Sequence, residues 1–531
     1  MRMHSCRPSF TALVILFLCG IHSGPAQGWT PDNSDGTYTN PVLFADYSDP
    51  DVVRVGNEYY LVSSSFQESP GLPILHSTDL VNWTIIGHAL DTLPSAIYSR
   101  PQFGNGVWAP SIRHHNGTFY IYYGDPDIGI FLVRTKNIRG TWEQPVLVEK
   151  GKGLIDPCPL WDDNGDAYLV HAWAKSRAGF NSMLTVHRMN AEGTAVTDTG
   201  SFVFDAHEKH PTMEGPKFYQ RNGFYYIFAP AGGVKTGWQT VLRGDSPFGP
   251  FKDSIVLQQM GTPVNGPHQG AWVEDISGNS WFIHFQDKGA YGRIVHLQPM
   301  KWQNDWPVMG DNGAPVMGAI KPASTKPSKR IIPQTSDDFS SSQLGLQWQW
   351  NANKRTKWYS LAARKGALRL HAVSRLSDVN NILGNPNILL QKFPAPSFSV
   401  TVTMDISRLA RGEHAGLIIA GMEYSALVFE RTDSTTTLSQ RNCADALHNG
   451  TETVGETISY PSTMIYLRAD VDTNAICRFS YSNNNKEYHP FGKEFTAQPG
   501  RWIGARIGLF ALSPPDQSTN GSADVLQIDI K

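Results

Sequence analysis

One short pattern recurs five times in the first 320 residues: a turn-forming pair or triplet followed directly by a run of aromatic and β-branched residues. Pairs such as Asn-Gly favour tight hairpin turns, and such runs are typical of strands. No long segment with a 3.6-residue hydrophobic period competes with them. The runs span residues 59–62, 119–123, 167–170, 224–228 and 281–285, roughly 50–60 residues apart.

Repeated four-stranded units of about this length are the signature of a β-propeller, in which polar loops surround the mouth of a central channel. Five such units fit into residues 29–320. The composition agrees, because 48 Gly and 35 Pro supply turns while only 17% of residues are charged. The sequence therefore predicts an all-β protein whose first domain is a five-bladed propeller.

A second domain follows the repeats. Residues 321–334 are rich in Pro, Ser and basic residues and are expected to form a linker. Residues 335–531 contain alternating stretches such as 398–404 and no propeller repeat. Alternation of this kind predicts a β-sandwich.

The N-terminus predicts export. Arg2 and Arg7 precede an uncharged apolar run, 12–21, and small residues follow, so residues 1–28 are expected to be a cleaved signal peptide. About ten apolar residues are too few to span a bilayer. We therefore expect a secreted or periplasmic protein without a membrane span. A net charge of -2 also argues against a nucleic-acid partner.

Three cysteines remain after the signal. Cys443 and Cys477 lie in one half of the chain and are the plausible disulfide pair in an oxidising compartment, which leaves Cys158 over. The sequence contains no Cys-x-x-Cys motif or His/Cys cluster, so a structural zinc site is not expected.

Three short segments that contain acidic residues occur at comparable places in different repeats. In a propeller, equivalent loops converge on the channel, so their carboxylates would meet. Like charges at close range raise at least one pKa, and glycoside hydrolysis needs one protonated and one ionised carboxyl group. A sugar-binding propeller without catalysis is the alternative. The segments are Ser48-Asp49-Pro50-Asp51, Leu154-Ile155-Asp156-Pro157 and Thr212-Met213-Glu214-Gly215-Pro216.

These segments occur in a specific order with two others, 107–112 and 265–270 (Asn-Gly-Pro-His-Gln-Gly). The ordered set resembles glycoside hydrolase family 43, five-bladed propeller enzymes that remove arabinose or xylose units. The resemblance implies an inverting mechanism with Asp49 as general base, Glu214 as general acid, and Asp156 raising the pKa of that acid and orienting the substrate. Nearby Asp51 is expected to be a structural hydrogen-bonding residue.

The resemblance also implies binding residues. Trp108 and Phe66 would be aromatic walls of the sugar pocket, and Arg293 would contact sugar hydroxyls and stabilise Asp49 as an anion. His268 matches a histidine on the propeller axis that in many members contacts a calcium ion or a water cluster. No cofactor is required, although a structural calcium is an option, there or between Asp338 and Asp529.

The stretches 123–130 and 171–179 look most like a subgroup with α-L-arabinofuranosidase activity, and β-xylosidase is the second reading. The partner would be an arabinose- or xylose-containing glycan. A fructan-cleaving enzyme is disfavoured, since Glu214 precedes Gly215 rather than Cys. Residues 335–531 resemble the concanavalin-like jelly roll of β-xylosidase-type members, which packs on the propeller and sometimes lends a loop to the active-site mouth. Carbohydrate binding by this domain and the oligomeric state stay open.

Overall fold

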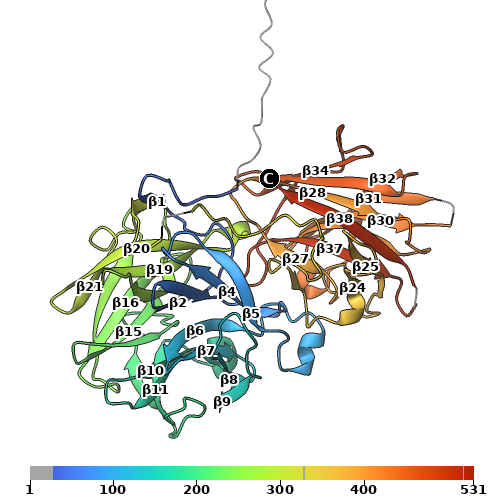
Figure 1. Cartoon of the computed structure of the whole chain (residues 1–531). Helices are drawn as coiled ribbons and strands as arrows, with labels where there is room; N and C mark the ends of the chain where they lie inside the picture. Colours follow the sequence, from blue (N-terminus) through green and yellow to red (C-terminus); the bar gives the residue numbers. More distant parts are fainter. Residues whose placement is uncertain (1–27, 327–328, 434, 518–519) are drawn as a thin grey trace, which may run out of the picture.

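The computed structural model describes residues 28–326, 329–433, 435–517 and 520–531. Two β-rich domains lie side by side, a propeller drawn in blue to yellow-green and a sandwich in yellow to red (Figure 1). The predicted fold class is confirmed. Within the described ranges, helical structure is limited to α1 (Lys175–Ala178) and four 3-10 turns, which are η1 (Ala96–Ser99), η2 (Gly289–Tyr291), η3 (Thr356–Trp358) and η4 (Ala446–His448).

Each propeller blade is a sheet of four antiparallel strands in chain order. The recurrent aromatic run of the sequence forms the second strand each time. The first blade comprises β2 (Asp51–Val55), β3 (Glu58–Val62), β4 (Gly71–Ser77) and β5 (Thr84–Leu90); the second β6 (Trp108–His115), β7 (Thr118–Asp125), β8 (Gly129–Thr135) and β9 (Val146–Lys150); the third β10 (Leu154–Trp161), β11 (Ala167–Trp173), β12 (Met183–Met189) and β13 (Ser201–Asp205); the fourth β14 (Lys217–Arg221), β15 (Phe224–Ala231), β16 (Trp238–Gly244) and β17 (Lys252–Gln258); and the fifth β18 (His268–Glu274), β19 (Ser280–Asp287), β20 (Arg293–Gln303) and β21 (Trp306–Met309).

The Asn-Gly pairs form the turns that their sequence predicts. Asn116 and Gly117 have φ values of 48° and 74°, and Asn222 and Gly223 have 51° and 79°. Positive φ at both central positions is the type I′ geometry, whose twist matches that of the flanking strands. These two pairs therefore join β6 to β7 and β14 to β15 as tight hairpins.

The ring closes through the N-terminal segment. β1 (Thr37–Thr39) pairs with β22 (Gly318–Ile320), and Leu43 exchanges two backbone hydrogen bonds with Val295 of β20, at 3.2 and 3.0 Å. The fifth blade also contacts the first through β18 and β2. The start of the domain is thereby fixed to its end.

A buried polar chain links successive blades. The Asp51 carboxylate accepts hydrogen bonds from the Arg113 guanidinium and the Ile112 amide, both at 2.8 Å. Arg113 in turn lies 2.9 Å from Cys158 Sγ and 5.1 Å from the centre of the Tyr219 ring. These contacts connect β2, β6, β10 and β14, which belong to four successive blades. Asp51 is therefore structural, as expected, and the unpaired Cys158 takes part in the same set of contacts through Arg113.

The second domain is a sandwich of two eight-stranded sheets. In β33 every second residue is fully buried, which is the alternation expected of a strand with one face on the core. The first sheet contains β23 (Gln349–Trp350), β27 (Leu389–Lys392), β37 (Arg506–Ser513), β29 (His414–Ala420), β30 (Tyr424–Arg431), β31 (Thr436–Cys443) and β32 (Thr453–Ser459), with β26 (Val373–Ser374) beside β37. The second contains β24 (Tyr359–Ser360), β25 (Leu368–His371), β38 (Ser522–Ile530), β28 (Phe398–Asp405), β33 (Met464–Val471), β34 (Ile476–Ser482) and β35 (His489–Pro490), with β36 (Phe495–Thr496) beside β34.

The predicted disulfide is wrong. Cys443 and Cys477 are both buried and free. Cys443 ends β31 of one sheet and Cys477 lies in β34 of the other, and the two side chains belong to separate hydrophobic clusters. The thiols therefore face different packing environments and do not meet.

The domains pack directly on each other. Ser69 of the propeller and Trp350 of the sandwich exchange two backbone hydrogen bonds, and the buried Arg506 of β37 pairs with Asp46 at 2.9 Å and Glu68 at 2.8 Å. Arg330 in the predicted linker donates to the backbone carbonyl of Asp32. These contacts place the sandwich next to the propeller loop that contains Asp46 and Asp49.

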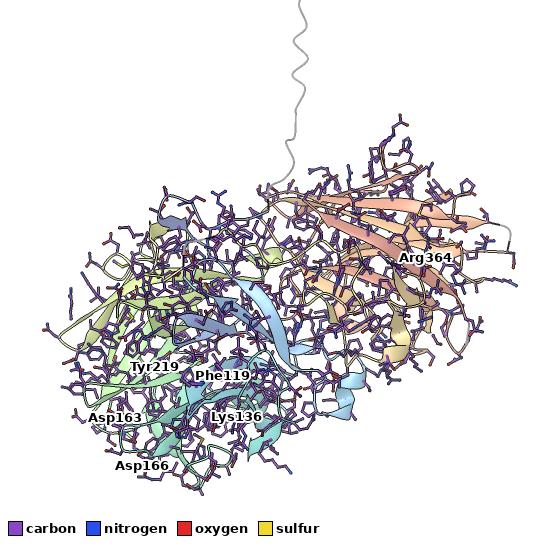
Figure 2. All side chains as sticks on the ribbon, viewed as in Figure 1. Phe119, Lys136, Asp163, Asp166, Tyr219 and Arg364 are labelled. Atoms are coloured by element: carbon purple, nitrogen blue, oxygen red, sulfur yellow. The ribbon has the colours of Figure 1, made fainter. Side chains whose placement is uncertain are left out.

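The turn between β10 and β11 is at the opposite side of the molecule. Asp163 and Asp166 on this turn lie at the propeller edge far from the sandwich (Figure 2). Asp156 is near the other end of β10. Asp156 therefore lies away from that outer edge, on the side of the propeller that faces the sandwich.

Candidate active site

A pocket of about 470 Å³, including its open mouth, gathers residues from all five blades and from the sandwich. The lining residues are Asp49, Phe66, Trp108, Ala109, Ile155, Asp156, Glu214, Val234, Gln269, Arg293 and Trp502. All three predicted catalytic acids and all three predicted sugar-binding residues therefore line one pocket.

Asp49 lies just before β2 and is held from two sides. One carboxylate oxygen accepts a hydrogen bond from the Arg293 guanidinium at 2.7 Å, and the other accepts from the Ser64 hydroxyl at 2.5 Å. Burial disfavours the charged form of Arg293, but several nearby carboxylates, Asp49 foremost, together outweigh it and raise the pKa of the guanidinium. A permanent cation thus sits beside this carboxylate, as the sequence predicted.

Asp156 is the most secluded of the three acids. One oxygen accepts hydrogen bonds from the Gly215 amide at 2.7 Å and from the Gln269 side-chain amide at 3.1 Å. Burial, followed by the charge of Glu214, raises the pKa of Asp156 well above the usual range of a carboxyl group. The two acids are therefore close enough to interact.

Glu214 is the acid most open to the pocket. Its side chain is 34% exposed, against 5% for Asp49. Its Oε1 lies 2.9 Å from Nε2 of the fully buried His268, and its backbone amide donates to the carbonyl of Pro230. His268 thus holds the Glu214 carboxyl group in place although His268 does not line the pocket itself.

The pocket concentrates unusual backbone geometry. Six of its lining residues have positive φ although none is glycine, and such conformations cost about 1–3 kcal/mol each. Strain of this kind persists where the surrounding structure holds it, commonly at functional sites. The residues are Asp49 (56°), Phe66 (51°), Ala109 (22°), Asp156 (57°), Gln269 (32°) and Trp502 (65°).

Aromatic rings form the walls. Trp108 and Trp502 meet edge to face, with their ring centres 6.2 Å apart, and the Arg177 guanidinium lies 5.6 Å from the centre of the Trp108 ring. The indole of Trp108 donates to the Gly104 carbonyl at 2.8 Å, which fixes its orientation. Trp502 comes from the sandwich, so that domain contributes directly to the pocket.

Gln269 and Trp502 line the pocket but were not predicted from the sequence. Gln269 follows His268 in the Asn-Gly-Pro-His-Gln-Gly segment, so its place in that segment was an available signal. No local signal marks Trp502, because it reaches the pocket only through the packing of the two domains.

Calcium remains a prediction. Among the described residues, no three His, Cys, Asp or Glu side chains converge as a metal site. Nδ1 of the buried His268 has no hydrogen-bond partner in the protein, so it is free to bind a water. Calcium prefers oxygen ligands, and the protein would supply few of them here. Asp338 and Asp529 instead accept hydrogen bonds from Ser340 and Gln527, respectively.

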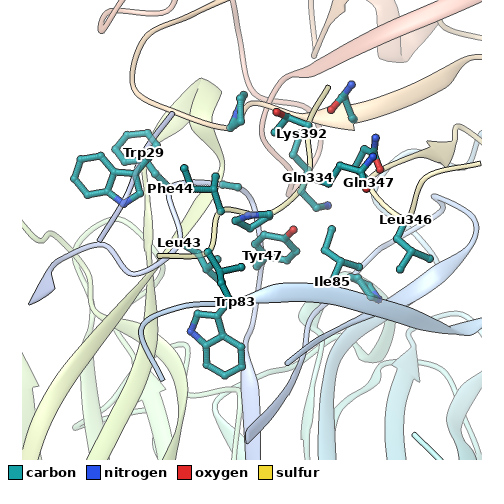
Figure 3. A pocket seen from close by; sticks show the side chains of 18 of the residues that line it. Trp29, Leu43, Phe44, Tyr47, Trp83, Ile85, Gln334, Leu346, Gln347 and Lys392 are labelled. Carbon is teal, nitrogen blue, oxygen red and sulfur yellow. The ribbon is translucent and has the colours of Figure 1, made fainter. Parts of the chain in front are cut away.

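A second pocket, of about 690 Å³ with its mouth, lies between the domains (Figure 3). Its walls include Trp29, Phe44 and Tyr47, with Lys392 at one side. No carboxylate lines it, so it lacks the groups needed for glycoside hydrolysis. The acidic pocket is therefore the candidate active site.

The propeller and its three converging acids define a glycoside hydrolase, and comparison with known proteins gives the family. Residues 38–307 match the model of glycosyl hydrolases family 43, and residues 336–531 match the β-xylosidase C-terminal concanavalin A-like domain. The chain belongs to glycoside hydrolase family 43.

Its relatives carry two kinds of name. A putative β-xylosidase of Xylanibacter ruminicola is 37% identical over 91% of this chain and 87% of its own length. The non-reducing end α-L-arabinofuranosidase BoGH43B of Bacteroides ovatus is 30% identical over 77% of this chain and 79% of its own.

Solved structures share the fold. The family 43 protein BlXynB of Bacillus licheniformis has a TM-score of 0.81 and 25% identity, over 93% of this chain and 99% of that one. A bifunctional protein of Bacteroides eggerthii has a TM-score of 0.82 and 28% identity; 93% of this chain is covered, but only 63% of that longer chain.

No helix among the described residues is long and apolar enough to cross a membrane. The predicted signal peptide, 1–28, lies outside the described residues except for Gly28.

Proposed function

We propose that the chain is an exported enzyme that removes terminal α-L-arabinofuranosyl residues from plant cell-wall glycans, with inversion at the anomeric carbon. The observation that carries the proposal is the convergence of Asp49, Asp156 and Glu214 in one aromatic-walled pocket. Such a set supplies both an ionised and a protonated carboxyl group to one bound sugar.

In the proposed reaction, the Asp49 carboxylate removes a proton from a water molecule, which attacks the anomeric carbon. Glu214 gives its proton to the glycosidic oxygen as the bond to the leaving group breaks. Inversion requires room for that water, so the two carboxyl groups should lie about 6.5–9.5 Å apart with substrate bound. The exposure of Glu214 toward the pocket suits contact with a leaving group that extends outward.

Asp156 and His268 act on Glu214 rather than on the bond. The buried Asp156 holds the Gly215 amide next to Glu214, and His268 contacts the Glu214 carboxyl group. Asp156 would orient the sugar as well as the acid, and a proton held by the Asp156–Glu214 pair would be available for transfer.

The two stretches that resemble arabinofuranosidases border the pocket wall. Arg177, in the second stretch, lies over Trp108 and pairs with Asp127, in the first, at 3.2 Å. This contact links both stretches to the wall that would face the sugar, which supports the choice of arabinofuranose. β-Xylosidase is the second candidate, because relatives that cover most of this chain carry that name.

The p-nitrophenyl glycosides of α-L-arabinofuranose and β-D-xylopyranose separate these candidates. We expect purified protein to hydrolyse both, with kcat/KM at least about tenfold higher for the arabinofuranoside, a difference equivalent to about 1.4 kcal/mol of transition-state binding. A preference for the xyloside would reverse the assignment. Release from neither compound, with arabinoxylan oligosaccharides also untouched, would remove the enzymatic function.

A further inference from the structure

Three aromatic side chains form a continuous patch on the third blade. The ring centre of Trp173 lies 4.9 Å from that of Phe180 and 6.2 Å from that of Phe202, and Phe180 and Phe202 are also 6.2 Å apart. Phe202 is 60% exposed, and Trp173 and Phe180 are half-buried beside it. We call these three residues the aromatic platform. Clustered apolar side chains left open to solvent commonly mark a binding surface.

The platform lies at the catalytic end of the blade. Trp173, the last residue of β11, pairs with Leu154, the first residue of β10, two residues before Asp156. Helix α1 lies in the sequence between Trp173 and Phe180 and carries Arg177, whose guanidinium lies over Trp108 at the pocket wall. Platform and pocket are thus joined by one short helix.

The platform also adjoins the segment that carries Glu214. Strand β13, which contains Phe202, runs directly into the chain that leads to Glu214. Ser182, two residues after Phe180, anchors that chain twice: its carbonyl accepts from the Ala206 amide and its hydroxyl from the Thr212 amide, both at 2.8 Å. Because Glu214 is the proposed proton donor to the leaving group, the leaving part of a substrate would extend toward this blade.

The chemistry of the platform favours sugar faces. Its three rings carry no charge, and the one polar atom among them, the Trp173 indole nitrogen, already donates to the Thr185 hydroxyl at 2.9 Å. Recognition would therefore come from aromatic faces packed against C–H groups, as on the faces of neutral pyranoses. The three rings offer no cation to pair with the charged group of an anionic glycan.

We propose that the aromatic platform binds the main chain of a neutral polysaccharide while a terminal pentose of that polymer occupies the acidic pocket. The inference rests on the proposed function, since it places the leaving part of the substrate. It adds a second contact region that makes the enzyme selective for polymers over short glycosides.

The test compares Phe202→Ala and the double variant Phe180→Ala/Phe202→Ala with Ile255→Ala. Ile255 is an exposed apolar residue on β17, the outer strand of the neighbouring blade, and is the matched control. We expect KM for soluble wheat arabinoxylan to rise about three- to tenfold in the platform variants. kcat/KM for p-nitrophenyl α-L-arabinofuranoside, and all values for the control, should stay within about twofold.

Affinity electrophoresis in gels that contain arabinoxylan separates this inference from the proposed function, because retardation needs no turnover. We expect the wild-type protein to be retarded and the platform variants to lose that retardation. Equal retardation of all proteins, a parallel loss on both substrates, or a change of oligomeric state in Phe202→Ala by light scattering would each overturn the platform as a polysaccharide site. Failure of wild-type protein to hydrolyse either substrate would overturn the proposed function instead.

Discussion

Glu214→Gln lowers kcat/KM for arabinoxylan oligosaccharides by about 10²–10⁴-fold, the usual contribution of a general acid. The amide has no proton of suitable acidity to give to the glycosidic oxygen. Its oxygen can still accept from His268 Nε2, and the backbone contact to Pro230 is unchanged, so the fold is retained. Steady-state kinetics on purified protein, with circular dichroism as a check of folding, measure the effect.

The nature of the leaving group sharpens this prediction. A p-nitrophenolate leaves without much protonation, so the same variant should lose far less on the aryl glycoside than on the natural one. Glu208→Gln is the matched control, since Glu208 is an exposed residue of the same segment. An equal loss on both substrates, or natural activity within tenfold of wild type, would remove Glu214 from the role of proton donor.

Arg506→Met destabilises the protein by about 3–5 kcal/mol. Arg506 is only 3% exposed and pairs with both Asp46 and Glu68, so its removal leaves two buried carboxylates without their ion-pair partner. Urea denaturation followed by fluorescence measures the change. Arg478→Met, which removes a half-exposed ion-pairing arginine of the same domain, should lower the free energy of unfolding far less, because exposed ion pairs are screened by solvent. Equal losses for the two variants would refute the importance of the buried cluster.

The same cluster makes stability depend on acid. Burial opposes ionisation of Asp46, but the cations Arg506 and Lys392, together with two backbone amide donors, outweigh it and lower its pKa to about 2. Because this pKa is lower in the folded than in the unfolded chain, Asp46 stabilises the protein fully above about pH 4, and that contribution is lost as the pH falls toward 2. Asp46 should keep this depressed pKa only with its cations, so Arg506→Met should show a shallower fall in stability across that range than wild type.

Asp46 also connects the domain interface to the active site. It accepts hydrogen bonds from the backbone amides of Arg293, at 2.9 Å, and Gly504, at 3.0 Å. Arg293 holds Asp49, and Gly504 lies two residues after Trp502. The buried Asp46 carboxylate thereby fixes the backbone of Arg293, which contacts the proposed base, and of Gly504, which lies close to the wall residue Trp502.

The propeller was predictable because its signal is local and repeated. Each hairpin turn, such as Asn116-Gly117, and each aromatic strand occupies a few consecutive residues, and equivalent positions in successive blades converge by geometry alone. Asp49, Asp156 and Glu214 lie in one pocket because the repeat places their loops around the same central axis.

What depends on the packing of distant segments was not predictable from the residues alone. Trp502 meets Trp108 only because the sandwich docks on the propeller. Cys443 and Cys477 share one half of the sequence, but the sheet to which each strand belongs separates them. The three acids Asp46, Asp49 and Asp51 are neighbours in sequence, yet they serve the domain interface, the pocket and the joint between blades, respectively.

Inversion is the most direct consequence of a base and an acid that act from opposite sides of the glycosidic bond. Proton NMR, recorded from the first minutes of hydrolysis at high enzyme concentration, detects which anomer of the released pentose forms before mutarotation. We predict that the first anomeric signal has the configuration opposite to that of the substrate, β from an α-L-arabinofuranoside. A first product with the same configuration as the substrate would contradict the roles assigned to Asp49 and Glu214.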